Sequence, residues 1–144
     1  MYGERQHRRA LATTVMLEAY HRIRAVLPPI IEGDGTQVQD DFYASDVARA
    51  NLLAMTASAS DEGMNIASGD DTSQNEVIDI LLRACNSNLA PEHKIDPAKR
   101  AMPQQTKQSY SRTRAKDLLG WEPQTPITQG IPRLVAWLDR QRDA

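Results

Sequence analysis

Residues 30–54, IIEGDGTQVQDDFYASDVARANLLA, contain a short apolar run, a glycine-rich turn and the start of a helix. The apolar pair at 30–31 predicts a short extended segment that the first glycine stops. Residues 41–44 predict a second short strand. Ser45 or Asp46 is a favourable N-cap for the Ala- and Leu-rich segment that follows, so a helix is expected there. The stretch therefore predicts two short strands around a turn, followed by a helix.

The turn has two possible roles. Gly33 and Gly35 allow positive φ, and a turn of this kind can direct peptide N–H groups to a phosphate or to the edge of a base. The alternative is a plain turn between two strands. Tyr43 and Asp46 also have two possible roles. They form a pair that faces a substrate, or Tyr43 is a half-buried strand residue and Asp46 only caps the helix.

Three further segments before residue 111 have a clear pattern. Apolar residues at steps of three and four predict an amphipathic helix over residues 9–26, which two prolines end. Residues 63–68 predict a short apolar strand, and Ser73 and Glu76 have the spacing of a capping box at the start of the next helix. Residues 86–110 contain three prolines and many polar residues, so we expect a long loop with one short strand.

The last third of the sequence predicts two more helices. Ser111 or Thr113 can cap the first, and Gly120 stands where a helix commonly stops. Thr128 is expected to cap the second. We interpret both tryptophans as core anchors rather than as residues that stack on a ligand.

The composition indicates an ordinary soluble globular protein. The chain has 144 residues, 40% of them hydrophobic and 25% charged, which suffices for one domain with a buried core. The net charge of -2 gives no signal for a polyanion, so a nucleic-acid partner is not expected. The sequence shows no signal peptide and no apolar run long enough for a membrane, and we predict a cytoplasmic location. The single Cys85 is interpreted as a small core residue.

Five motifs in sequence order resemble one family. They are YGERQ (2–6), IIEGDGTQ (30–37), YASDVARANLLA (43–54), MNIASGDDTSQNEV (64–77) and RAKDLLGWEPQTPITQGI (114–131). Together they resemble the C-terminal half of the extended short-chain dehydrogenase/reductase family, the NAD-dependent nucleotide-sugar epimerases and dehydratases. The matching order and spacing extend over nearly the whole chain.

The resemblance implies a fold of the α/β class. Residues 1–144 would form a single partial domain, the C-terminal substrate-binding lobe of an extended short-chain dehydrogenase. This lobe includes the last strand-helix unit of the Rossmann sheet and lacks the N-terminal Rossmann half.

The resemblance also implies a substrate site. In the family, the loop aligned with Ile31 and Glu32 makes backbone contacts to the nucleotide base, and the position aligned with Gln39 is often an arginine that binds the diphosphate. The glutamine can donate hydrogen bonds but lacks the charged fork of arginine. Asp41 stands where that motif has an aromatic residue, and Gln104 lies near the place of a further polar contact in the long loop. The substrate-binding residues predicted in this way are Tyr2, Arg5, Ile31, Glu32, Gln39, Tyr43 and Gln104.

The chemistry of the family requires more than this sequence contains. The family oxidises a sugar with NAD, which requires a dinucleotide site, a base with a lowered pKa and a lysine beside it. The sequence has no G-x-G-x-x-G motif, and none of its four tyrosines has a lysine four residues on. We therefore predict no catalytic residue and no cofactor bound by this chain alone, although NAD serves the family.

The sequence thus predicts the nucleotide-sugar-binding portion of an enzyme that resembles UDP-glucose 4-epimerase, inactive alone. Three explanations remain open: a partial reading frame, one chain of a split epimerase, or a non-catalytic module that binds a sugar nucleotide or a protein. The expected partners are a UDP-sugar-like ligand and either a separate Rossmann half or a second copy of the chain. Neither nucleic acid nor a membrane is expected.

Overall fold

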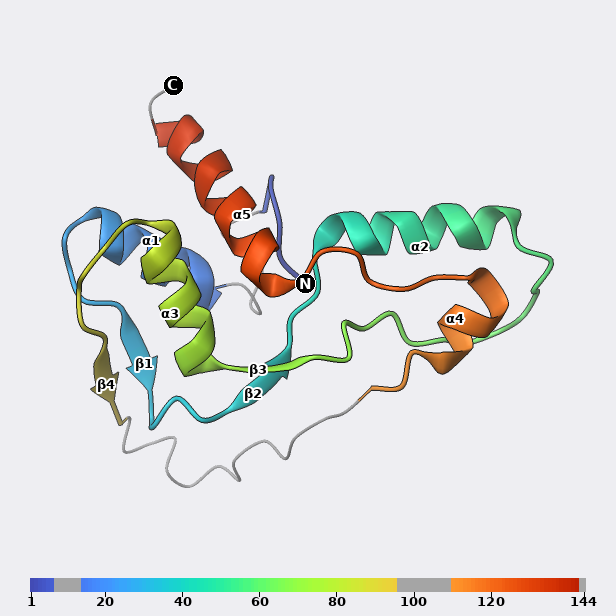
Figure 1. Cartoon of the computed structure of the whole chain (residues 1–144), viewed down its shortest axis with the longest axis horizontal. Coiled ribbons are helices and arrows are strands. Elements are labelled where there is room, and N and C mark those ends of the chain that lie inside the picture. Colours follow the sequence, from blue (N-terminus) through green and yellow to red (C-terminus); the bar gives the residue numbers. More distant parts are fainter. Residues whose placement is uncertain (7–13, 96–109, 143–144) are drawn as a thin grey trace.

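The computed structural model describes residues 1–6, 14–95 and 110–142, in which helices are interspersed with short strands (Figure 1). The α/β class predicted from the sequence is confirmed. The elements in chain order are α1 (Thr14–Arg24), β1 (Ile30–Glu32), β2 (Val38–Asp40), α2 (Ala44–Thr56), β3 (Asp71–Ser73), α3 (Gln74–Ala84), β4 (Glu92–Lys94), α4 (Thr113–Leu119) and α5 (Ile127–Arg142).

The described strands form two short pairs and not one sheet. β1 runs parallel to β4 with Ile31 opposite His93, and β2 runs antiparallel to β3 with Gln39 opposite Thr72. β1 confirms the strand predicted at the apolar pair, and β4 confirms the short strand expected within residues 86–110. The turn after β1 carries the chain from one pair to the other (Figure 1).

Two predicted strands are wrong. Residues 41–44 contain only an isolated parallel bridge between Tyr2 and Tyr43, because the pairing with β3 uses the three residues before them. Residues 63–68 do not form a strand, since no segment of the described chain pairs with them. The strand in this region, β3, begins only at Asp71.

Other local predictions are confirmed. α1 is the described part of the helix predicted over residues 9–26, of which residues 9–13 lie outside the described chain. The capping box of α3 is present: the Ser73 hydroxyl accepts from the backbone N–H of Glu76, and the Glu76 carboxylate accepts from the backbone N–H of Ser73. Gly120 ends α4 with a φ of 63°.

The predicted N-caps of α2, α4 and α5 are wrong. α2 has Tyr43 as its N-cap residue, and the Ala44 N–H donates to the carbonyl of Tyr2. α4 follows Arg112 without a side-chain cap. α5 begins before Thr128, because the carbonyl of the proline just ahead of the helix accepts its first backbone bonds. The residues that were predicted as N-caps but are not the N-cap residues of these helices are Ser45, Asp46, Ser111, Thr113 and Thr128.

The main core lies where α1, α3 and α5 pack together, with β1 against them (Figure 1). Burial of each large apolar side chain contributes roughly 1.5–3 kcal/mol. Cys85 is buried, as predicted. The buried members of this core are Tyr2, Met16, Ala19, Tyr20, Ile23, Ile31, Tyr43, Val77, Ile78, Leu81, Leu82, Cys85, Ile131, Leu134 and Val135.

α2, α4 and the segments that connect them to the rest form an arm, residues 44–68 and 113–125, that extends away from the main core (Figure 1). Its own small core centres on Trp121, which is fully buried and confirms the predicted anchor. Trp137 is only half-buried on α5 and belongs to neither cluster, so that part of the prediction is wrong.

Asp46 holds the arm together. The residue is 3% exposed, and its carboxylate accepts the backbone N–H groups of Gln124 at 3.1 Å and Thr125 at 3.0 Å. Its backbone carbonyl accepts the indole N–H of Trp121 at 2.8 Å. A buried carboxylate needs such donors, so Asp46 fixes the connector after α4 instead of capping α2.

α2 carries two large apolar side chains that are exposed. Leu52 is 65% exposed and Met55 81% exposed, and residues 64–67 have no paired strand in the described chain. Exposed apolar groups and an unpaired segment both favour self-association.

The double variant Leu52→Lys, Met55→Lys should therefore stay monomeric up to a higher protein concentration than the wild-type chain. Its Tm should change little. Light scattering after size exclusion measures the first quantity and calorimetry the second. Leu27→Lys, at an exposed apolar residue outside the arm, is the matched control. The prediction would be contradicted if Leu27→Lys raised the monomer concentration as much as the double variant does. It would also be contradicted if the wild-type chain were a monomer that melts cooperatively at high concentration.

An ion pair with several hydrogen bonds joins α1 to α5. Arg24 Nε donates to Asp139 Oδ1 at 2.8 Å and Arg24 Nη2 to Oδ2 at 2.5 Å, while the Tyr20 hydroxyl donates to Oδ1 at 2.7 Å. Burial alone raises the pKa of Asp139, but the bonds from Tyr20 and Arg24 outweigh it and lower that pKa. A lowered folded-state pKa stabilises the protein above the unfolded-state pKa, and this stabilisation is lost as the pH falls through the folded-state value.

Asp139→Asn should lower the free energy of unfolding by about 1–2 kcal/mol at neutral pH, a range that allows for the partial exposure of the pair. The difference from wild type should shrink below about pH 4, where aspartate begins to take up its proton. Urea titration at several pH values measures it. Asp79→Asn breaks the more exposed Asp79–Arg83 pair and should change the same quantity by less than about 0.5 kcal/mol. A similar loss in both variants would speak against the special role of Asp139.

Candidate functional site

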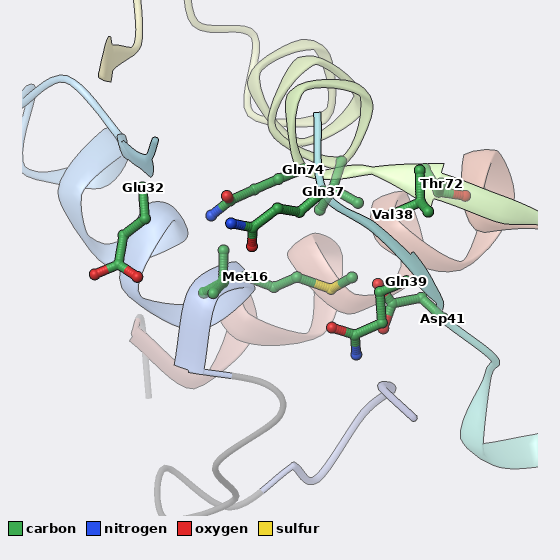
Figure 2. A pocket seen from close by; sticks show the side chains of 10 residues that line it. Met16, Glu32, Gln37, Val38, Gln39, Asp41, Thr72 and Gln74 are labelled. Atoms are coloured by element: carbon green, nitrogen blue, oxygen red, sulfur yellow. The ribbon is translucent and has the colours of Figure 1, made fainter. Parts of the chain in front are cut away.

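A cavity of about 150 Å³ lies beside the turn between β1 and β2, against α1 and α3 (Figure 2). It has a polar rim and an apolar floor, the usual composition of a small-ligand site. The residues that line it are Val15, Met16, Glu32, Gln37, Val38, Gln39, Asp41, Thr72, Gln74 and Val77.

The turn beside the cavity is fixed by the first residues of α3. Gly33 and Gly35 have φ values of 71° and 72°, which confirms the positive φ expected from the sequence. The backbone N–H of Asn75 donates to the carbonyl of Gly35 at 3.1 Å, and its side-chain amide donates to the carbonyl of Asp34 at 2.9 Å. A Cβ on Gly35 would overlap the side chain of Asn75, whereas one on Gly33 would meet open space.

Amides and carboxylates form the polar rim. Figure 2 shows the side chains of Gln37 and Gln74 close together, with Glu32 on one side and Gln39 and Asp41 on the other. Burial raises the pKa of Asp41 and the neighbouring Asp40 carboxylate raises it further, while the N-terminal amine opposes both. The rim can therefore accept and donate several hydrogen bonds.

Two of the predicted substrate residues, Glu32 and Gln39, line the cavity. Ile31 stands next to Glu32 in β1, but the whole residue is 1% exposed and does not line the cavity. Arg5 is exposed, has a φ of 62° and is not among the lining residues. Gln104 lies outside the described residues.

Tyr2 and Tyr43 form a buried pair and do not line the cavity. They are 1% and 2% exposed, and their rings meet edge to face with centroids 5.3 Å apart. The Tyr43 hydroxyl donates to Glu4 Oε2 at 2.5 Å, and burial raises the pKa of both phenols well above the usual value. Tyr43 is therefore a fully buried residue and not a half-buried strand residue. The Asp46 carboxylate accepts backbone N–H groups of the arm and not the Tyr43 hydroxyl.

Sequence reasoning missed much of the lining. Gln74 follows the capping Ser73 and Gln37 follows the glycine turn, so each stands beside a signal that the sequence did show. The pattern could not indicate that these two turns meet. Met16 and Val77, predicted only as helix residues, form part of the apolar floor.

The described residues do not fit a dinucleotide. A Rossmann-type site needs a parallel strand that leads through a glycine loop directly into a helix. β1, which is parallel to β4, leads through its glycine turn into β2. Among the residues that the structure describes, no cluster of His, Cys, Asp or Glu could hold a metal ion. No helix within the same residues is long and apolar enough to cross a membrane.

Comparison with known proteins identifies the family. The family profile described as GDP-mannose 4,6 dehydratase matches residues 1–134. A Methanocaldococcus jannaschii protein, provisionally named a UDP-glucose 4-epimerase, is 32% identical over 143 residues, which are 96% of this chain and 43% of that protein.

Solved structures of related enzymes also match nearly the whole of this chain. UDP-glucose 4-epimerase from Thermotoga maritima, solved with UDP-glucose, matches with a TM-score of 0.85 and 30% identity over 98% of this chain and 44% of that one. UDP-glucuronic acid 4-epimerase from Bacillus cereus, solved with UDP-glucuronic acid and NAD, matches in fold with a TM-score of 0.79, at 21% identity over 97% of this chain and 43% of that one.

The chain belongs to the NAD-dependent epimerase/dehydratase family of extended short-chain dehydrogenases/reductases. It spans less than half the length of these relatives.

Gly35→Ala should destabilise the protein more than Gly33→Ala. Both variants force a non-glycine residue into positive φ, at about 1 kcal/mol each, and only Gly35→Ala must also displace the Asn75 side chain, which adds roughly another 1 kcal/mol. Chemical denaturation measures the two losses. In an Asn75→Ala background the additional loss should disappear. Equal losses for the two glycine variants would contradict this role of Asn75.

Proposed function

We propose that this chain is the C-terminal, nucleotide-sugar-binding portion of a UDP-glucose 4-epimerase-like enzyme and that it does not turn over a sugar nucleotide alone. The main support is the match over 98% of the chain to an epimerase solved with UDP-glucose, at 30% identity. The five motifs occur in the order found in the C-terminal half of the family. The missing Gly-rich and Tyr-x-x-x-Lys motifs support inactivity of the chain alone.

In this proposal the backbone at Ile31 and Glu32 contacts the nucleotide base, and Gln39 contacts the diphosphate. Gln39 lies on β2 with an exposed side chain at the cavity, where its amide can donate to a phosphate oxygen. It lacks the bidentate charge of the arginine that the family often has there. We therefore expect weaker binding of UDP-sugars than in relatives with the arginine.

A second candidate is one chain of a split epimerase. The exposed apolar residues Leu52 and Met55 and the unpaired segment 64–67 favour it, because a partner with an open parallel sheet would cover the first and pair with the second. Mixing the chain with a separately produced Rossmann half of a relative tests this candidate. Epimerase activity of the mixture supports it, and the absence of any association excludes it.

Isothermal titration with UDP-glucose tests the main proposal. We expect weak binding by the wild-type chain and binding tighter by up to about tenfold for Gln39→Arg, because a charge-assisted pair to the diphosphate adds on the order of 1 kcal/mol. Gln141→Arg, at an exposed residue of α5, adds the same charge away from the cavity and should leave binding unchanged.

Two results would contradict the proposal. One is the absence of heat for both the wild-type chain and Gln39→Arg at millimolar UDP-glucose. The other is interconversion of a UDP-hexose by the purified chain with added NAD.

A further inference from the structure

One peptide unit connects strand β2 of the candidate site to the arm. The β2–β3 pair lies between the three-helix core and the arm (Figure 1). The first segment of the arm begins after β2 and ends at Ser68, and the peptide unit between Ser68 and Gly69 stands at this end. Its N–H donates to Asp40 Oδ2 of β2 at 3.1 Å, and its carbonyl accepts from the Arg112 guanidinium. We call Asp40, this peptide unit and Arg112 the peptide link.

Opposite charges act on the two ends of this peptide unit. The N–H and the carbonyl of a trans peptide point in opposite directions, so Asp40 and Arg112 lie on opposite sides of it. A carboxylate at the N–H and a guanidinium at the carbonyl polarise the unit in the same sense, so each bond strengthens the other. Since Arg112 is the N-cap residue of α4, the peptide link joins β2 to α4.

The turn that contains the peptide unit is shaped for these contacts. Gly69 has a φ of 74°, and a Cβ there would overlap the Arg112 guanidinium. Asp40 Oδ1 accepts two further bonds from Ser68, one from its backbone N–H at 2.9 Å and one from its hydroxyl at 2.5 Å. Asp40 stands directly opposite Asp71 in the β2–β3 register, where two like charges are unfavourable. The bonds from the turn offset this cost.

The arm is a packing unit of its own. α2 packs against α4, and their buried side chains gather around Trp121 in a cluster that is separate from the main core. The start of α2 is held by a backbone bond from Ala44 to the carbonyl of Tyr2. The peptide link is the contact that connects the start of α4 to β2.

Asp40 is adjacent in β2 to the residue proposed to contact the diphosphate. Successive side chains of a strand point to opposite faces, so Gln39 faces the cavity while Asp40 faces the turn at Ser68. The two residues share one short strand, and a displacement of Asp40 therefore also displaces the Gln39 amide. The position of the arm and the position of this amide are thus linked through the strand.

Resting on the proposed function, we propose that Asp40 and Arg112 are positioning residues that couple the arm to the diphosphate contact of Gln39. A partner that holds the arm in this arrangement then tightens the binding of a diphosphate ligand without touching the cavity. Because such coupling is reciprocal, the ligand also favours this arrangement of the arm by the same factor.

Amide signals of the ¹⁵N-labelled chain without ligand test the peptide link itself. Arg112→Gln removes the positive charge at the carbonyl, so the Gly69 amide proton should move upfield although its acceptor carboxylate is unchanged. The side-chain amide signal of Gln39 should shift as well. Arg112→Lys keeps the charge and should reverse part of both changes, whereas Arg114→Gln, at an exposed residue within α4, should cause neither. Unchanged Gly69 and Gln39 signals in Arg112→Gln would overturn the inference.

Titrations of the labelled chain in the Gln39→Arg background test the effect on ligand binding. The probes are UDP-glucose and uridine, which lacks phosphate. Asp40→Asn and Arg112→Gln should each raise the Kd for UDP-glucose by about threefold or more and leave the Kd for uridine unchanged. For Asp40→Asn, charge alone predicts the opposite, because loss of a carboxylate near the diphosphate would tighten binding. Asp70→Asn, which removes an exposed carboxylate outside the peptide link, should not weaken binding.

Two results of these titrations would overturn the inference. One is an equal loss of affinity for UDP-glucose and uridine, which indicates a merely structural role. The other is unchanged or tighter binding of UDP-glucose in both variants. Retained chemical shifts of the three-helix core establish that each variant is folded, and Arg112→Gln provides the test alone if Asp40→Asn does not fold.

The signals without ligand distinguish this inference from the proposed function. If UDP-glucose binds to no variant while Arg112→Gln still shifts the Gly69 and Gln39 signals, the proposed function is contradicted and the peptide link is not. If UDP-glucose binds with an affinity that responds to neither Asp40→Asn nor Arg112→Gln, the coupling is contradicted and the proposed function is not.

Discussion

The antiparallel pairing of β2 with β3 is the contact on which the candidate site depends. Only three residues of each strand pair, and so short a ladder is marginal alone. Asp40 reinforces one end, because its carboxylate accepts the backbone N–H groups of Ser68 at 2.9 Å and Gly69 at 3.1 Å. At the other end the Gln74 N–H donates to the Gln37 carbonyl at 3.1 Å. Both strands contribute lining residues, so losing this pairing would separate two walls of the cavity.

The sequence predicted best the features whose causes lie within a few residues. The capping box needs only Ser73 and Glu76, and the positive φ at Gly33 and Gly35 is a property of the turn itself. Burial of Cys85 followed from its place in an apolar helical stripe. These signals sufficed for the α/β class and for the turn beside the cavity.

The features that the sequence could not predict depend on distant partners. Residues 63–68 have the apolar pattern of a strand, but a strand also needs a neighbour, and none pairs with them in the described chain. Asp46 looked like a helix cap, yet its carboxylate binds backbone groups almost eighty residues further along. The polar rim arises in the same way, because Gln37 and Gln74 come from segments that only the fold brings together.

The different surroundings of the two tryptophans make each a separate optical reporter. Trp121 is fully enclosed in the arm, bonded to a carbonyl and with the Arg49 guanidinium 5.7 Å from its ring centre, whereas Trp137 is partly open to water on α5. Enclosure shifts indole emission to shorter wavelength, so replacing either tryptophan by phenylalanine leaves a fluorescence signal from one region alone. Loosening of the arm can thus be followed separately from unfolding of the three-helix core.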